Sequence, residues 1–127
     1  MANVPQDLKY TSQHEYLKPA EEEGVYYVGI TDYAQGELGD IVFVELPKAG
    51  SRYDANQSFG TIEAVKAVSD LYMPVSGEVV DVNVELDANP AVINSDPYGQ
   101  GWMVKVRADG PLGGDLLDAA GYEALIG

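Results

Sequence analysis

Residues 58–79 read SFGTIEAVKAVSDLYMPVSGEV, and this stretch decides the fold. Its two runs at 58–65 and 67–73 are rich in β-branched and aromatic residues, which suit a half-buried pleated strand. Lys66 alone stands between the two runs. We therefore expect a β-hairpin over about residues 60–75 that protrudes from the body of the protein and carries Lys66 near its tip.

Strand signals dominate the rest of the chain. Short apolar runs bounded by turn residues predict further strands at 25–30, 41–46, 77–86 and 102–106, while proline and glycine mark 89–101 as a loop. Many short strands separated by turns are typical of an all-β sandwich or barrel. The whole chain, 1–127, is therefore expected to form one mainly β domain.

Helical signal is confined to two short segments. Thr31 or Asp32 can cap a short helix that ends at Gly39. A second helix is expected over about residues 115–126, with Asp115 as its cap and an apolar stripe of leucine and alanine.

A weak internal repeat relates two of the predicted strands. GDIVFV at 39–44 resembles GEVVDV at 77–82, and each copy is followed by Glu-Leu and later by Asp-Ala-Asn. The three short motifs occur in the same order in both copies, which favours a duplication, although such runs also arise by chance in β proteins. A duplication would place the copies in two half-sheets related by a pseudo-two-fold axis, with the hairpin between them.

The composition limits the classes of function. The chain has 127 residues and a formal net charge of −14, from 7 basic and 21 acidic side chains. An acidic surface repels phosphate backbones and anionic lipid, so we expect no nucleic-acid or membrane partner but partners with basic faces. Because the chain has no long apolar run and no leader-like start, we expect a cytoplasmic protein, and we expect it to be a monomer.

The cysteine and histidine counts exclude cysteine chemistry and metal sites built from several histidines. With no cysteine, the chain has no disulfide and no thiolate nucleophile. His14 is the only histidine, so a multi-histidine metal site is excluded, and we expect no metal. Hydrolysis by clustered carboxylates is an alternative function, but no acid pair lies in a recognisable pocket motif.

Lys66 differs from the other four lysines in its setting. Two small or apolar residues flank it on each side, with Glu63 and Asp70 just outside them. An isolated lysine on a strand is usually a solvated residue that blocks edge-to-edge pairing. The wider sequence context decides between that interpretation and a functional one.

The pentad EAVKA at 63–67, followed by PVSGEV at 74–79, resembles the modified-lysine hairpin of lipoyl-carrying domains. Valine and alanine flank the lysine here, whereas a biotin carrier would be expected to flank it with methionines. Over nearly its whole length the chain is similar to the glycine cleavage system H-protein family. The other segments that carry this resemblance are LKYTSQHEY at 8–16, GITDYAQ at 29–35, LGDIVFVELP at 38–47 and INSDPYGQGWM at 93–103.

The resemblance implies a fold and a task. The fold is a lipoyl-domain-like barrel-sandwich hybrid of two antiparallel sheets, with short helices after the first strands and at the C-terminus. The task is that of a non-catalytic carrier with lipoic acid in amide linkage on Lys66. Glycine decarboxylase would load an aminomethyl group, aminomethyltransferase would take up the one-carbon unit, and dihydrolipoyl dehydrogenase would reoxidise the dithiol. An alternative is a relay that donates lipoyl or octanoyl groups to other lipoyl-dependent complexes.

The resemblance also implies roles for residues around Lys66. Lipoate-attaching enzymes would recognise Glu63, the small Ala67, Asp70 and Gly77 on or beyond the hairpin. Gly77 is explained equally well as a turn residue, because glycine adopts backbone conformations that other residues avoid.

The lipoyl-lysine side chain would form an arm, which is loaded when it carries the aminomethyl group. We expect a surface cleft to receive the loaded arm. A carboxylate in the cleft would hold the amine of the aminomethyl group through a charge-assisted hydrogen bond. Glu15 is the first choice for this carboxylate, and Asp70 or Glu63 is the next. His14 is expected to pack or hydrogen-bond near the cleft. Many relatives carry a histidine where this chain has Tyr33, so a phenol hydroxyl would replace an imidazole there.

Overall fold

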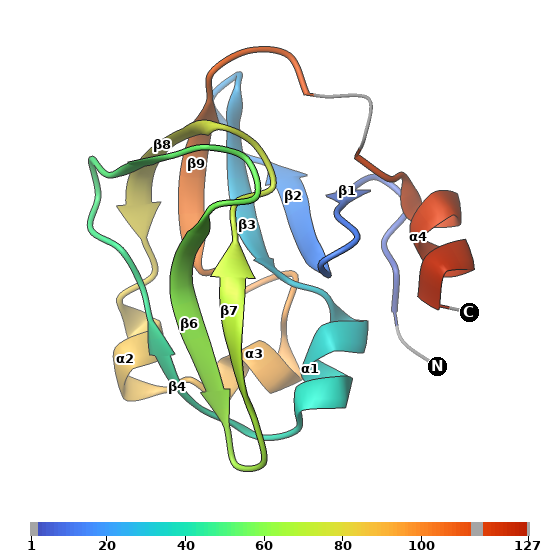
Figure 1. Cartoon of the computed structure of the whole chain (residues 1–127), viewed down its shortest axis with the longest axis vertical. Coiled ribbons are helices and arrows are strands. Elements are labelled where there is room, and N and C mark those ends of the chain that lie inside the picture. Colours follow the sequence, from blue (N-terminus) through green and yellow to red (C-terminus); the bar gives the residue numbers. More distant parts are fainter. Residues whose placement is uncertain (1–2, 113–115, 127) are drawn as a thin grey trace.

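The computed structural model describes residues 3–112 and 116–126, and its strands form two antiparallel sheets (Figure 1). The larger sheet has the order β1-β2-β3-β9-β8-β5, and the smaller has the order β4-β6-β7. The strands of the larger sheet are β1 (Lys9–Tyr10), β2 (Glu15–Pro19), β3 (Val25–Ile30), β9 (Val104–Ala108), β8 (Gly77–Val82) and β5 (Arg52–Tyr53). Those of the smaller sheet are β4 (Ile41–Glu45), β6 (Ser58–Ala64) and β7 (Val68–Tyr72). The expected mainly β fold of two antiparallel sheets is therefore confirmed.

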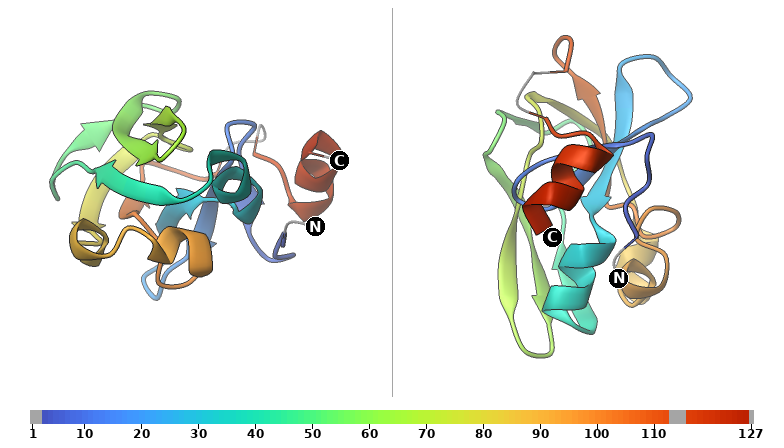
Figure 2. Two further views of the ribbon diagram at one scale, coloured as in Figure 1. Left: turned by 90° about the horizontal axis from the view of Figure 1, so that it is seen from below. Right: turned by 90° about the vertical axis from the view of Figure 1, so that its right-hand side faces the viewer.

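One apolar core lies between the two sheets, which form separate layers (Figure 2). Val28, Val79 and Val104 enter it from the larger sheet, and Ile62 and Leu71 enter from the smaller one. Burying a side chain of this size stabilises the fold by about 1.5–3 kcal/mol. This core fixes β6 and β7, and thus the base of the hairpin.

A second apolar cluster joins the first strands to the C-terminal helix α4 (Ala119–Ile126). Within it the rings of Tyr10 and Tyr122 stack with their centroids 4.7 Å apart. The backbones of Tyr10 and Leu117 also exchange two hydrogen bonds of 2.8 Å. These contacts place Tyr122 beside the start of β2.

Helix α1 (Asp32–Leu38) forms where the capping residues predict it. The Thr31 hydroxyl accepts a hydrogen bond from the Ala34 N–H at 3.2 Å, which satisfies one of the unpaired donors at the helix start. Gly39 ends the helix at φ 84°, a conformation that favours glycine. The turn after Gly39 then passes beside the tip of the β6–β7 hairpin (Figure 1).

The segment 83–95 differs from expectation. The predicted strand 77–86 ends at Val82, and two short helices follow, α2 (Glu85–Ala88) and α3 (Val92–Ser95). The side chain of Asn83 ends the strand, because its amide donates to the carbonyls of Gln100 and Trp102. The prediction of an unbroken loop over 89–101 was therefore wrong at α3.

Other boundaries differ by small amounts. The strand expected at 102–106 is β9 at Val104–Ala108, and sequence patterning did not predict the strands β1, β2 and β5. The C-terminal helix begins at Ala119, and the expected cap at Asp115 lies outside the described residues. The two copies of the weak repeat form β4 and β8, which belong to different sheets. Their origin by duplication stays a prediction.

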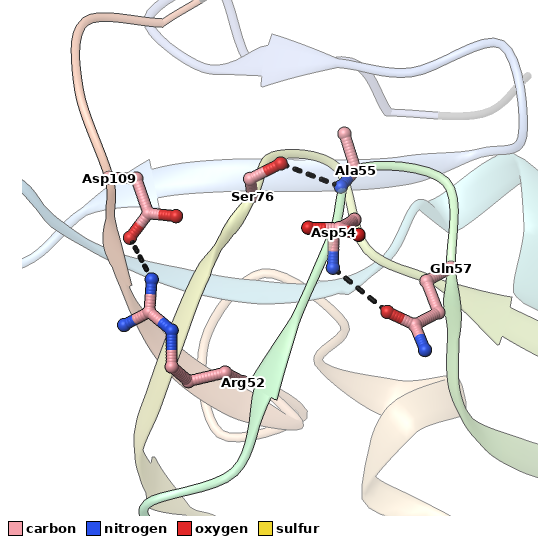
Figure 3. Close-up of polar contacts among 6 residues, drawn as sticks. All are labelled: Arg52, Asp54, Ala55, Gln57, Ser76 and Asp109. Carbon is pink, nitrogen blue, oxygen red and sulfur yellow. Dashed lines mark hydrogen bonds and ion pairs between the residues drawn. The ribbon is translucent and has the colours of Figure 1, made fainter.

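The end of the molecule opposite the hairpin is closed by polar contacts (Figure 3). Arg52 pairs with Asp109, and the Ser76 hydroxyl accepts from the Ala55 N–H at 2.9 Å. Exposed ion pairs contribute little to stability, and β5 also pairs with β8 through its backbone. No residue singled out for function lies among these contacts.

Candidate functional site: a hairpin lysine and an acidic cleft

The hairpin between β6 and β7 turns through Val65 and Lys66. The Ala64 N–H donates to the Ala67 carbonyl at 2.7 Å and closes this two-residue loop. A second hydrogen bond of 3.0 Å, from the Val65 N–H to the Asp40 carbonyl, joins the tip to the turn after α1. Lys66 and Ala67 are both exposed.

The Lys66 side chain extends from the tip over Gly39. A Cβ placed on Gly39 would lie 3.3 Å from Lys66 Cε, so the two residues are in contact. The salt bridges found within residues 3–112 and 116–126 involve Arg52, Lys105 and Arg107 and leave the Lys66 ammonium unpaired. Lys66 is thus an exposed amine on a loop with a fixed base.

A cleft of about 260 Å³ opens between α1, the turn before β2 and the strand β7. Its apolar walls include Ile30, Leu38 and Ile62, and its carboxylates are Glu15, Asp70 and Glu37. The full lining is Gln13, His14, Glu15, Ile30, Tyr33, Ala34, Glu37, Leu38, Ile62, Ser69, Asp70 and Leu71. One cavity therefore contains four of the predicted site residues, namely Glu15, His14, Tyr33 and Asp70. The cavity combines apolar walls with negative charge.

Glu15 is the most buried carboxylate of the cleft, with 2% of its surface exposed. One carboxylate oxygen accepts from the Thr11 hydroxyl at 3.1 Å, and the other accepts from the Tyr72 N–H at 3.2 Å. Burial raises the pKa of Glu15 to about 8, although the two hydrogen bonds act in the opposite direction. Glu15 therefore holds a proton at neutral pH when no cation is nearby.

His14 lines the cleft and has a positive φ of 71°. Its ring centroid is 5.2 Å from that of Tyr33, and its Nδ1 lies 2.8 Å from the hydroxyl of Tyr122. Burial lowers the pKa of His14, and the charge of Glu37 partly offsets this effect. The imidazole is therefore mainly neutral at neutral pH.

The other nominated residues lie outside the cleft lining. Glu63 stands on β6 between Phe43 on β4 and Val68 on β7. Gly77 is buried at the start of β8, where a Cβ would collide with the carbonyl of Arg107 on β9. A close approach of two strands therefore requires glycine at position 77.

Sequence reasoning missed three contributors to the cleft. The backbone N–H of Tyr72 and the hydroxyls of Thr11 and Tyr122 contact Glu15 or His14 directly. A backbone donor leaves no sequence signal, and Tyr122 is 108 positions from His14. Thr11 is a local partner, four positions before Glu15, whereas only the fold brings Tyr72 and Tyr122 to the cleft.

In residues 3–112 and 116–126, no group of three or more His, Cys, Asp or Glu side chains is arranged to hold a metal ion. None of the helices in these ranges has the length and apolar character needed to cross a membrane.

The two-sheet fold with a lysine at a hairpin tip defines a lipoyl-domain-like protein. The sequence profile of the family described as Glycine cleavage H-protein matches residues 8–126. The chain belongs to this family, and it is a non-catalytic carrier component of the glycine cleavage system.

Individual relatives agree with this assignment. The glycine cleavage system H protein of Chlorobium limicola is 56% identical over 126 residues, covering 98% of each chain. That of Bacteroides thetaiotaomicron is 50% identical over 125 residues, also with 98% of each chain covered. The crystal structure of the H protein from Mycobacterium marinum superposes with a TM-score of 0.86 at 42% identity, and covers 95% of this chain and 97% of that one.

Proposed function

We propose that this chain carries a lipoyl group in amide linkage on Lys66 and shuttles the aminomethyl group of glycine from glycine decarboxylase to aminomethyltransferase. In the same cycle it would deliver electrons to dihydrolipoyl dehydrogenase. The observation that carries the proposal is the exposed ammonium of Lys66 on a two-residue loop, beside a cleft lined by carboxylates. When bound, the lipoyl group supplies the two sulfurs at which the aminomethyl group and the electrons are held.

Lys66 serves in this proposal as a tether. The closed Ala64–Ala67 turn fixes the lysine backbone, while the side chain itself is exposed. A lysine extended by a lipoyl chain reaches about 15 Å from its Cα, as ordinary bond lengths require. With that reach, the sulfurs could enter either the cleft of this chain or the active site of a partner enzyme.

The cleft suits a chain that is apolar along its length and cationic at its end. Ile30, Leu38 and Ile62 offer an apolar wall, and Glu15 and Asp70 lie on the same cavity. Burial of the arm would shield the carbon–nitrogen bond of the cargo from water. We propose Glu15 as the group that accepts the hydrogen bond of the amine, with Asp70 as the second carboxylate.

Glu15 would change its protonation state when the amine arrives. Its pKa of about 8 in the empty cleft means that the carboxyl oxygen carries a proton near pH 7. A cation within hydrogen-bond distance lowers the pKa of a carboxyl group, so Glu15 would release this proton and become the ionic partner.

Recognition by the enzymes that attach lipoate would involve the exposed strip beside Lys66. Glu63, Ala67 and Asp70 all lie on or next to the hairpin. Gly77 would act differently, by keeping β8 against β9. The acidic surface, with a net charge of −14, favours partners with basic faces, and these contacts should weaken as salt rises.

Peptide mass mapping of protein from its own host tests the attachment site. We expect a lipoyl adduct on Lys66, and we expect Lys66→Arg to abolish both the adduct and glycine-dependent reduction in a system reconstituted with the partner enzymes. Lys48→Arg, at another exposed lysine, is the matched control. An adduct on a different lysine, or full activity of Lys66→Arg, would overturn the proposal. Modified protein that is inactive with these partners would favour a relay of lipoyl groups instead.

The rate of ammonia release from loaded protein tests the cleft. We expect Glu15→Gln to release ammonia faster than wild type, because an amide cannot form the charge-assisted bond. Glu45→Gln, a change at an exposed carboxylate outside the cleft lining, should match wild type. Equal rates for all three proteins would remove Glu15 from this role.

A further inference from the structure

A chain of hydroxyl groups connects the C-terminal helix to the imidazole of the cleft. The Tyr122 hydroxyl lies 2.8 Å from His14 Nδ1 and 2.7 Å from Thr31 Oγ1. Thr31 and Tyr122 are both fully buried. The three residues come from the turn before β2, the cap of α1 and the helix α4, so each protrudes from a different element.

The direction of the hydrogen bonds that link Thr31, Tyr122 and His14 follows from the partners of Thr31. Its Oγ1 already accepts from the Ala34 N–H at 3.2 Å, and its other partner among the described residues is the Tyr122 hydroxyl. The threonine proton must therefore point to the Tyr122 oxygen, since burial leaves no water to receive it. The Tyr122 proton is then directed at His14 Nδ1, which must act as acceptor.

We propose that Tyr122 is a positioning residue that holds His14 as the neutral tautomer with its proton on Nε2, and so leaves the cleft free of a second cation. This inference rests on the proposed function, in which a cationic amine enters the cleft. With Nδ1 bound to Tyr122, Nε2 carries the ring N–H and can donate only to a group with an acceptor atom, not to the amine itself.

Protonation of His14 would disrupt the hydrogen bonds that link it to Tyr122 and Thr31. A proton on Nδ1 would force the Tyr122 oxygen to accept, and Tyr122 would then donate to Thr31. The Thr31 proton would lose its partner in a buried site, which is costly. Burial raises the pKa of Tyr122 to about 12, so this hydroxyl remains a donor throughout the neutral range.

Burial is the larger effect on His14 and lowers its pKa, and among the charged groups that face the ring Glu37 acts in the opposite direction. Glu37 on α1 raises the pKa of His14, while Glu15 and Asp70 line the same cavity from β2 and β7, and Tyr33 packs on the ring. A cationic imidazole would pair with these carboxylates and compete with an incoming amine. The hydroxyl chain opposes that outcome.

The backbone around His14 keeps its ring in place. The His14 carbonyl accepts from the Thr31 N–H at 3.0 Å, and the His14 N–H donates to the Thr11 carbonyl at 3.1 Å. A positive φ is uncommon for histidine, and these two bonds hold it. The imidazole and its hydroxyl partners are therefore fixed relative to one another.

Nitrogen NMR of the full-length chain tests the tautomer directly, because His14 is the only histidine of the sequence. Untagged protein with labelled histidine, without lipoate, should show the Nε2–H tautomer and a pKa below the ordinary value. A dominant Nδ1–H tautomer in wild type would overturn the inference without any variant.

Tyr122→Phe removes the hydroxyl and retains the ring that stacks on Tyr10. We expect mixed tautomers and a rise of the His14 pKa by roughly half to one unit, the effect of one lost neutral hydrogen bond. Thr31→Ser keeps the hydroxyl and should behave as wild type. Tyr10→Phe, which loses a hydroxyl bonded to the Pro5 carbonyl, is the control that leaves His14 unchanged. Unaltered tautomer and pKa in folded Tyr122→Phe would refute the role of Tyr122.

The loaded protein provides an independent measurement. At about pH 6, ammonia release should be several-fold faster in Tyr122→Phe than in Tyr10→Phe, because protonated His14 competes with the amine for the carboxylates. If the NMR prediction fails, the inference is overturned, whatever the rate of ammonia release from the loaded protein. If the NMR prediction holds and Lys66 bears no lipoyl group, only the proposed function fails.

Discussion

Glu15 accepts a hydrogen bond from the backbone N–H of Tyr72 at 3.2 Å, although the two residues are 57 positions apart. Glu15 begins β2 in the larger sheet, and Tyr72 ends β7 in the smaller one. The contact therefore joins the two sheets at the cleft. It also explains why a carboxyl group with 2% exposure is tolerated, since both of its oxygens have partners.

The buried carboxyl of Glu15 should make stability depend on pH. Its pKa of about 8 in the folded state exceeds the unfolded value of about 4.3. Between these values the native state holds the extra proton, so the stabilisation is complete below the unfolded pKa and is lost as pH rises through the folded pKa.

Glu15→Gln should remove this dependence, because the amide keeps the shape of the side chain and does not titrate. Denaturant unfolding between about pH 5 and pH 8 should show wild type losing up to roughly 1 kcal/mol per pH unit more than the variant. Glu45→Gln, at an exposed position, should keep the wild-type slope. Parallel slopes for wild type and Glu15→Gln would show that Glu15 is ionised in the folded state.

Gly77→Ala should destabilise the fold without removing Lys66. A Cβ at position 77 meets the Arg107 carbonyl and lies 3.0 Å from Val106 Cγ1, so β8 and β9 must separate. We expect a loss of about 1–3 kcal/mol in the free energy of unfolding. Gly36→Ala is the matched control, because its Cβ meets no atom within 4 Å and the helix gains roughly 0.5–1 kcal/mol.

The same variant separates two roles of Gly77. At a temperature where Gly77→Ala remains folded, the extent of lipoyl attachment to Lys66 can be measured by intact mass. Attachment at the wild-type rate would assign Gly77 to strand packing alone. A large loss in the folded variant would support recognition by the attaching enzyme.

Asn94→Ala should loosen the turn that supports the hairpin. Its side-chain amide donates to the Gly39 carbonyl at 2.9 Å and to Gln35 at 2.8 Å, and its oxygen accepts from the Ile41 N–H at 2.9 Å. Loss of three bonds to a half-buried side chain should cost about 2–4 kcal/mol in unfolding measurements. Asn89→Ala, at an exposed position, should change stability by less than about 0.5 kcal/mol. Similar stabilities for both variants would contradict the structural role of Asn94.

Gly39→Ala tests the contact with Lys66. Gly39 at φ 84° and Gly24 at φ 81° both have a positive φ that other residues rarely adopt, so alanine at either position should cost roughly 1–3 kcal/mol in thermal unfolding. Only Gly39 also touches Lys66, and the end of that side chain can move aside. We therefore expect equal rates of Lys66 modification in the two variants. A tenfold loss confined to Gly39→Ala would show that Lys66 must lie over Gly39 to be modified.

The sequence predicted much of the fold because its signals are local. The alternation of residues in β6 and β7, the single lysine between them and the cap at Thr31 all depend on near neighbours. The same local rules failed at 83–95, where Asn83 and Asn94 form hydrogen bonds to distant backbone groups. Those bonds end β8 early and order α3.

The sequence by itself determined the exposed hairpin lysine, the acidic charge and the family resemblance, because spacing and composition carry that information. Only the tertiary structure produced the cleft, in which Glu15 is buried with a raised pKa and His14 contacts the hydroxyl of Tyr122. The physical reason is that a pKa and a tautomer depend on the atoms that surround a group. Here those atoms belong to residues 57 and 108 positions away along the chain.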